Sequence, residues 1–130
     1  MSTTILVVDD SATTRSLVAS FLSELQETEV VEAASGFEAL RVLPARPVDL
    51  IVTDINMPDI NGLELISFVR ANPNYRRIPV VIITTENSAE DRKRGLDLGA
   101  SAYLVKPFGA DDLRRAVASA LARGRQGEGG

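Results

Sequence analysis

The stretch Ile5-Leu6-Val7-Val8-Asp9-Asp10 carries the strongest indication of the fold of this chain. Four consecutive aliphatic residues are too few for a helix, and two aspartates end the run abruptly. A short and nearly continuous apolar run of this kind is typical of a strand that is buried on both faces of a parallel sheet. We therefore expect the chain to begin with a central strand of such a sheet.

Three similar runs and one weaker run follow along the chain. The similar runs are Leu50–Val52, Val80–Ile83 and Ala102–Val105. The segment Glu29–Ala33 mixes polar with apolar residues, so we expect it to form a less buried edge strand.

Apolar residues recur at helical spacing between these runs. The patterns lie at Leu17–Leu25, Phe37–Leu43, Leu65–Val69 and Leu113–Leu121. We expect Ser11 to cap the first helix, and Pro44 and Pro47 to bracket a loop.

A weaker helical pattern occupies Ser88–Leu98. Charged residues fill its centre, and only Ala89 and Leu96 are plainly apolar. We expect a helix that is loosely held and has a solvated face.

Strand and helix patterns alternate five times, which predicts an α/β fold of the doubly wound kind with one parallel sheet. We expect residues 1–123 to form the domain and the glycine-rich residues 124–130 to form a flexible tail. Functional residues of such folds lie outside the carboxyl ends of the strands.

The composition narrows the chemistry that is available. The 130 residues include no cysteine and no histidine, which excludes disulfides, thiol nucleophiles and a phosphohistidine on this chain. A bound metal would need oxygen ligands, which favours Mg²⁺ or Ca²⁺. The net charge of −4 does not suggest a nucleic-acid or membrane partner, and without a signal peptide or membrane span we expect a cytoplasmic protein.

Polar residues gather where the predicted strands end. Asp9 and Asp10 follow the first strand, Asp54 the third, Thr84 and Thr85 the fourth, and Lys106 the fifth. In a parallel sheet these residues share one edge. Each alone has an ordinary explanation, such as a helix N-cap for the aspartates or a rigid turn for Lys106-Pro107. Four separate strand ends are harder to explain by coincidence.

Three neighbouring carboxylates repel one another unless a proton or a cation lies among them. Mg²⁺ suits such a pocket, because it takes few protein oxygens and leaves positions for phosphate. A carboxylate beside the cation can attack phosphorus, while the cation and the ammonium of Lys106 neutralise the phosphoryl charge. The hydroxyl of Thr84 could then donate a hydrogen bond to a phosphoryl oxygen.

In these motifs the sequence resembles the receiver domains of bacterial response regulators, and among them the CheY-like single-domain regulators. The resemblance runs from about Thr4 to Ala122. The matching pieces are Ile5–Ser11, Asp54–Gly62, Ile82–Thr84 and Gly99–Phe108. It implies a flavodoxin-like (βα)5 fold with strand order 2-1-3-4-5.

The resemblance also implies roles for matching residues. Asp54 would be the phosphoacceptor, and Thr84 and Lys106 would contact the phosphoryl group. Mg²⁺, with Mn²⁺ as a possible substitute, would be held by Asp9, Asp10, Asp54 and the main-chain carbonyl of Asn56. The bond between Lys106 and Pro107 is usually cis in this family.

Further implied roles concern the switch and the lifetime of the signal. Tyr103 matches the aromatic switch residue, which turns inward as the threonine moves toward the phosphate; it could equally be a half-buried strand aromatic. Asn56 and Glu86 match the positions that tune dephosphorylation and suggest a short lifetime. Thr85 stands where a small residue is expected and could slow the attacking water.

The resemblance implies a sensor histidine kinase or a histidine phosphotransfer domain as the phosphoryl donor. The target would bind the face formed by the Ser88–Leu98 helix, the last strand and the last helix. The chain would be a monomer or a phosphorylation-dependent dimer. Such a domain catalyses only its own phosphorylation and dephosphorylation and is a switch, not an enzyme. Chemotaxis or motility is the pathway we favour.

Four alternatives remain at this point. A phosphatase with an aspartyl nucleophile would need a second aspartate where Asn56 stands. A flavin or nucleotide binder would meet repulsion from Asp9 and Asp10, and the chain has no phosphate-binding loop. The chain could also be a receiver from a longer regulator, or an interaction module that works without phosphorylation.

Overall fold

The computed structural model describes residues 2–85 and 88–128. Five parallel strands form one sheet in the order β2-β1-β3-β4-β5. Strands and helices alternate as β1 (Thr3–Val8), α1 (Ala12–Ser23), β2 (Thr28–Ala33), α2 (Gly36–Ala45), β3 (Leu50–Asp54), α3 (Gly62–Ala71), β4 (Val80–Thr84), α4 (Ala89–Asp97), β5 (Ala102–Val105) and α5 (Ala110–Glu128). The predicted fold class and strand order are therefore confirmed.

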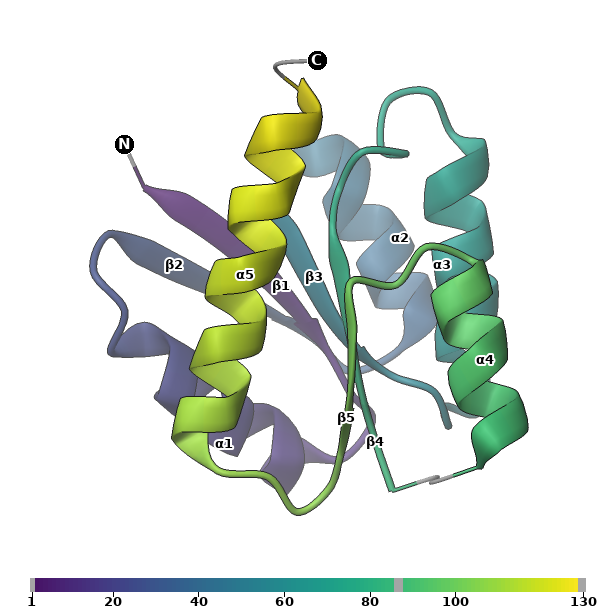
Figure 1. Ribbon diagram of the computed structural model, residues 1–130, viewed down its shortest axis with the longest axis horizontal. Coiled ribbons are helices and arrows are strands. Elements are labelled where there is room, and N and C mark those ends of the chain that lie inside the picture. Colours follow the sequence, from purple (N-terminus) through teal and green to yellow (C-terminus); the bar gives the residue numbers. More distant parts are fainter. Residues whose placement is uncertain (1, 86–87, 129–130) are drawn as a thin grey trace.

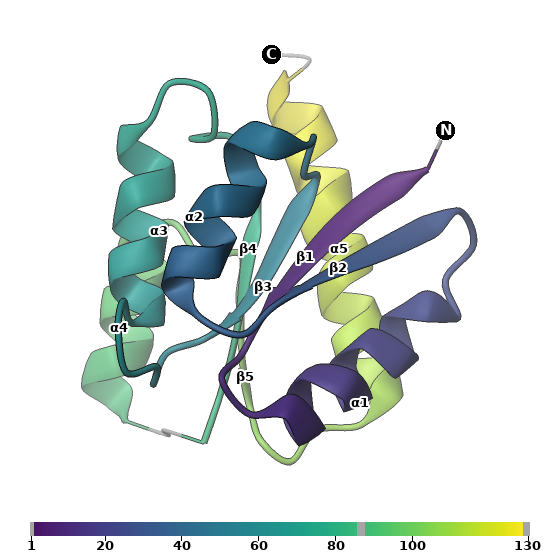
Figure 2. The ribbon, with the colours of Figure 1, turned by 180° about the vertical axis from the view of Figure 1, so that it is seen from behind.

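Helices cover both faces of the sheet. Helices α1 and α5 pack on one face (Figure 1), and α2, α3 and α4 pack on the other (Figure 2). Among the described residues, no helix combines the length and the apolar character that a membrane crossing requires.

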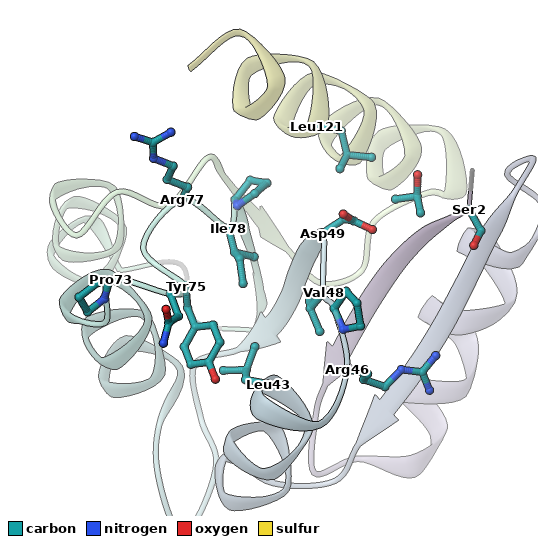
Figure 3. Close-up of a pocket in the computed structure, with 14 residues that line it drawn as sticks. Ser2, Leu43, Arg46, Val48, Asp49, Pro73, Tyr75, Arg77, Ile78 and Leu121 are labelled. Carbon is teal, nitrogen blue, oxygen red and sulfur yellow. The ribbon is translucent and has the colours of Figure 1, made fainter. Parts of the chain in front are cut away.

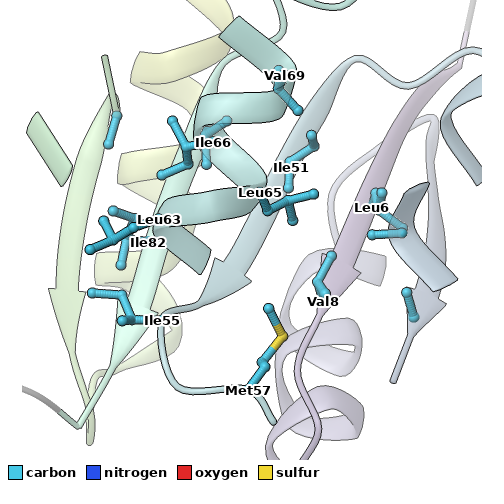
Figure 4. Packing of buried hydrophobic residues seen from close by; sticks show 14 of the residues in the cluster. Leu6, Val8, Ile51, Ile55, Met57, Leu63, Leu65, Ile66, Val69 and Ile82 are labelled. Carbon is cyan, nitrogen blue, oxygen red and sulfur yellow. The ribbon is translucent and has the colours of Figure 1, made fainter. Parts of the chain in front are cut away.

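The apolar runs fill both layers because neighbouring residues of a strand point to opposite faces. In β1, Ile5 and Val7 pack toward α1 and α5, whereas Leu6 and Val8 pack toward α2 and α3. Figure 4 shows Leu6 and Val8 in the second of these layers with Ile51 of β3 and side chains from α3. Strand β2 lies at the sheet edge and is only partly buried, as predicted.

Helix starts fix the loops that surround the carboxyl ends of the strands. Ser11 caps α1 by accepting a hydrogen bond from the Thr14 N–H, as predicted. Asn61 and Glu64 form a reciprocal capping box at the start of α3. The carboxylate of Asp59 accepts hydrogen bonds from the N–H groups of Gly36 and Phe37 at 3.3 and 3.0 Å, which ties the loop after β3 to the start of α2.

Two details of the helices differ from the sequence prediction. Pro44 lies inside α2, in its last turn, whereas we predicted that it would border a loop. Proline has no N–H to donate to the preceding turn and cannot continue a helix without disruption, and α2 ends one residue later, after Ala45. Helix α5 continues past Gly124 to Glu128; the predicted flexibility of residues 124–130 remains a prediction.

Gly62 is required by a close approach between α3 and the end of β3. A Cβ atom at this position would lie 2.2 Å from the carbonyl oxygen of Asp54. The Gly62 N–H also donates a hydrogen bond of 2.8 Å to the carbonyl of Ile55. The loop between Asp54 and α3 therefore has no space for a side chain here.

We predict that Gly62→Ala lowers the free energy of unfolding by about 1–3 kcal/mol, because backbone must move to admit the methyl group. Urea denaturation would measure this loss. Gly109→Ala is the control, since its Cβ would meet Asp112 at 3.6 Å, an ordinary contact, and its cost should stay below about 1 kcal/mol. Equal stability of Gly62→Ala and the native protein would contradict the crowding.

Candidate functional site

The acidic cluster consists of the carboxylates of Asp9, Asp10 and Asp54, at the carboxyl ends of β1 and β3. One oxygen atom from each residue lies within 4.8 Å of the other two. The two strands are neighbours, and Val8 pairs with Thr53. Asp9 and Asp54 are the next residues of the two neighbouring segments. Asp9 is fully buried, Asp54 is 7% exposed and Asp10 is exposed. The sheet thus brings together the three aspartates that the sequence analysis singled out.

Lys106 extends into the acidic cluster from the end of β5. Its ammonium Nζ lies 3.0 Å from Asp9 Oδ2 and 3.3 Å from Asp54 Oδ2. The Lys106 N–H donates a hydrogen bond of 2.7 Å to the carbonyl of Thr84, which joins the ends of β4 and β5. The peptide bond between Lys106 and Pro107 is cis.

The carboxylate of Asp54 is held on both sides. Its Oδ1 accepts hydrogen bonds from the N–H groups of Ile55 and Asn56 at 2.7 and 3.4 Å. Burial raises the pKa of Asp54 above its ordinary value and outweighs the ammonium of Lys106, which lowers it; the nearby Asp9 adds to the increase. Burial therefore makes the ionised form of Asp54 more costly in the folded protein, and a nearby positive charge offsets part of this cost.

Every polar group of Asp9 has a partner, as its complete burial requires. Its Oδ1 accepts a hydrogen bond of 2.8 Å from the Ser11 N–H, and its own N–H donates to the carbonyl of Ala33 at 3.1 Å. Its carbonyl oxygen accepts a hydrogen bond of 2.7 Å from Arg15 Nη1. Arg15 was not predicted as a site residue, because nothing in the local sequence shows that a side chain from α1 returns to the end of β1.

Of the remaining predicted residues, Thr84 ends β4, Thr85 follows it, and Asn56 lies two positions after the end of β3. Thr84 is fully buried at the end of β4, directly after Ile83, which pairs with Asp54. Asn56 and Thr85 are exposed. Glu86, predicted to tune dephosphorylation, lies outside the described residues.

Tyr103 is buried in β5, with only 6% of its surface exposed. It pairs with Ile82 of β4. The guanidinium of Arg92 on α4 lies over its ring, 5.5 Å from the centroid. The ring thus lies beneath α4. Gly95 is the only residue of α4 that is buried in the described structure.

The donor set of the acidic cluster fits a hard divalent cation. Carboxylate oxygens from three residues converge within the range that one ion could bridge. Hard cations such as Mg²⁺ prefer oxygen ligands. The cluster could therefore bind a metal ion.

A separate cavity of about 630 Å³ lies at the opposite edge of the sheet, near the start of β1. Figure 3 shows Leu43, Asp49 and Tyr75 among the side chains around it. Its described lining residues include none of the three aspartates of the cluster. The acidic cluster therefore lies outside this cavity, at the edge of the sheet where the strands end.

The raised pKa of Asp54 predicts a pH-dependent stability. The folded protein keeps this proton at pH values where the unfolded chain has lost it, so stability falls as the pH rises from the ordinary aspartate pKa through the raised one. Each unit of the difference corresponds to about 1.4 kcal/mol. Asp54→Asn, which cannot ionise, should be more stable than the native protein at neutral pH when chelator removes metals.

Thermal unfolding of both proteins as a function of pH measures this difference. It should shrink as the pH falls and vanish below the ordinary aspartate pKa. A lower stability of Asp54→Asn at neutral pH would show that the attraction to Lys106 exceeds the cost of burial.

Comparisons with known proteins agree with this geometry. Residues 5–118 match the model of the response regulator receiver domain. The chain is 39% identical over 126 residues to a chemotaxis protein CheY homolog from Campylobacter jejuni, with 96% of each chain covered. It is 42% identical over 105 residues to chemotaxis protein CheY1 from Helicobacter pylori, covering 80% of this chain and 85% of the other.

A solved structure shows the same arrangement of strands and helices. Chemotaxis protein CheY4 from Vibrio cholerae superposes with a TM-score of 0.86 at 35% identity, over 92% of this chain and 99% of the other. The fold, the acidic cluster at the strand ends and the match over most of the sequence lead to one conclusion. This chain belongs to the response regulator receiver domain family.

Proposed function

We propose that this protein accepts a phosphoryl group on Asp54 and thereby changes a partner-binding surface. One observation carries the proposal: three aspartates and a lysine from separate strands converge at one sheet edge. Membership of the receiver family makes the chain a signalling switch rather than an enzyme and implies a histidine kinase as partner.

The phosphoryl transfer is a displacement at phosphorus. A carboxylate oxygen of Asp54 forms the new bond to phosphorus, while the bond between phosphorus and the donor histidine nitrogen breaks and its electron pair stays with the imidazole. Asp54 is well placed for this role, because hydrogen bonds from Ile55 and Asn56 fix its Oδ1. The donor is a sensor histidine kinase or a histidine phosphotransfer domain.

We assign Mg²⁺ to the acidic cluster, with Mn²⁺ as a substitute. The carboxylates of Asp9, Asp10 and Asp54 and the main-chain carbonyl of Asn56 would hold it. When bound, the cation neutralises charge on the incoming phosphoryl group. Lys106 contributes a second positive charge from the side of β5.

The switch begins at Thr84 and Lys106. A phosphoryl group adds roughly −1.5 to −2 charge and three acceptor oxygens, which attract the Thr84 hydroxyl and the Lys106 ammonium. The hydrogen bond from the Lys106 N–H to the Thr84 carbonyl links their movements. Tyr103 and the weakly anchored α4 would then change the target-binding face formed by α4, β5 and α5.

The relatives suggest the pathway and the lifetime of the signal. Several similar proteins are named as chemotaxis proteins, so we place this switch in chemotaxis signalling. We place it in the cytoplasm, as a monomer or a phosphorylation-dependent dimer. Asn56, Thr85 and Glu86 would set the rate at which water removes the phosphoryl group.

A phosphorylation assay with a small donor tests the proposal. Acetyl phosphate or phosphoramidate should yield a modified species, separated on a phosphate-affinity gel, only when Mg²⁺ is present. Asp54→Asn should abolish the species, whereas Asp97→Asn, which alters an exposed aspartate of α4, should leave it unchanged. Metal binding without modification of the native protein would favour an interaction module that works without phosphorylation.

The variant Lys106→Met tests whether the lysine and the metal share one site. Without the ammonium, the fully buried Asp9 loses its ion pair, which should destabilise the metal-free protein by as much as ~3–5 kcal/mol. Mg²⁺ would supply the missing positive charge, so it should raise the melting temperature of Lys106→Met more than that of the native protein.

Thermal unfolding with Mg²⁺ and with chelator measures both effects. Lys93→Met is the control, because its pair with Asp97 is exposed and worth only about 0.3–0.5 kcal/mol. An equal Mg²⁺ response in Lys106→Met and the native protein would contradict a shared site for lysine and metal.

A further inference from the structure

We propose that Arg15 is a positioning residue for the metal site, because it fixes the backbone from which Asp9 and Asp10 project. Its guanidinium holds the β1–α1 loop, residues 9–11, against the edge strand β2. The effect of Arg15 on metal binding rests on the proposed function. The effect of Arg15 on the β1–α1 loop rests on the structure alone.

The guanidinium of Arg15 makes two contacts with different parts of the fold. Its Nη1 donates a hydrogen bond of 2.7 Å to the carbonyl of Asp9. Its Nε lies 3.2 Å from Glu32 Oε1 on β2, in an ion pair. Only 18% of the Arg15 side chain is exposed, compared with 43% of that of Glu32, so the contact to Asp9 is the more protected of the two.

The carbonyl that Arg15 binds belongs to the peptide between Asp9 and Asp10. Asp9 is fully buried with Arg15 in place, so removing the guanidinium takes the side-chain donor from a carbonyl that does not reach bulk water in the native fold. The loop would have to move, or water would have to enter, to satisfy the oxygen. Either change shifts Asp10, whose exposed carboxylate contributes one oxygen to the acidic cluster.

The charge of Arg15 and its contact with the loop predict opposite changes in Mg²⁺ affinity when Arg15 is removed. The positive charge of Arg15 repels a divalent cation, so electrostatics alone predicts that its removal strengthens Mg²⁺ binding. Loss of the hold on the loop predicts weaker binding, because groups that orient metal ligands typically contribute 10–100-fold in affinity. The sign of the change therefore separates a positioning role from a mere surface charge.

The chain offers a matched control in Arg114 of α5. Arg114 Nε donates a hydrogen bond of 3.0 Å to the carbonyl of Phe21, and its Nη2 pairs with Glu24. It thus binds one backbone carbonyl and one glutamate, as Arg15 does, but between α1 and α5, and it also lies 3.7 Å from the exposed Asp111 on its own helix. Arg114→Met removes the same charge and the same kinds of contact without touching the loop at residues 9–11.

The experiment compares Arg15→Met, Arg15→Lys and Arg114→Met with the native full chain by two measurements. Calorimetric titration gives the affinity for Mg²⁺. Arg15→Met should bind about 10-fold more weakly, Arg15→Lys should lie between it and the native protein, and Arg114→Met should match the native protein. Equal or tighter binding by Arg15→Met would overturn the positioning role.

Amide hydrogen exchange in chelator tests the hold on the loop without any metal. Arg15→Met should exchange faster at residues 9–12, with unchanged exchange in β3 and β4, and Arg114→Met should show no change at the loop. Unchanged exchange in Arg15→Met would overturn the proposal even if the native protein binds no Mg²⁺. Absence of Mg²⁺ binding by the native protein, with faster loop exchange in Arg15→Met, would instead reject the proposed function and keep the hold on the loop.

Discussion

The ammonium of Lys106 between the carboxylates of Asp9 and Asp54 is the interaction on which the site depends. Both carboxylates are buried or nearly so, and their charges would repel each other without a cation between them. The lysine is in reach only because β5 ends beside β4 and β4 beside β3. The parallel sheet thus creates the site by aligning the ends of strands that are distant in sequence.

The same arrangement connects the site to the surface of the protein. Lys106 and Thr84 share a main-chain hydrogen bond, and Tyr103 lies in β5, three positions before the lysine along the chain. Above Tyr103 lies Arg92 of α4, the helix in which Gly95 is the buried residue. Gly95 allows a close approach, since a Cβ there would lie 2.6 Å from Ile82 Cδ1. Helix α4 is therefore held near its carboxyl end and weakly elsewhere, which suits an element that moves when charge at the site changes.

Much of this structure could be predicted from the sequence because apolar runs of four or five residues have few interpretations. The runs at Ile5–Val8 and Val80–Ile83 became central strands, and the mixed run at Glu29–Ala33 became one edge strand. The apolar run at Ala102–Val105 was expected to be buried on both faces, but it forms the other edge strand and only Tyr103 in it is buried. The gathering of Asp9, Asp10, Asp54 and Lys106 followed from the parallel topology alone. Their roles in phosphoryl transfer came from the resemblance to receiver domains and await experiment.

Other features depend on tertiary contacts that periodicity does not contain. Phe37 and Leu17 fit helical apolar patterns but are 59% and 49% exposed, so apolar spacing alone does not identify which residues of a helix are buried. Phe68 is also exposed, and it stacks on Tyr75 with ring centroids 6.5 Å apart. Arg15 reaches back from α1 to the carbonyl of Asp9, a contact that requires the folded turn at Ser11.

Chemical trapping of the phosphorylated residue tests the central claim most directly. Borohydride reduces an acyl phosphate to an alcohol, so a phosphorylated aspartate becomes homoserine, which peptide mass spectrometry locates in the sequence. After reaction with acetyl phosphate and Mg²⁺, the account predicts homoserine at position 54 and no conversion when Mg²⁺ is omitted. Conversion at another aspartate, or at Asp54 independently of the metal, would contradict it.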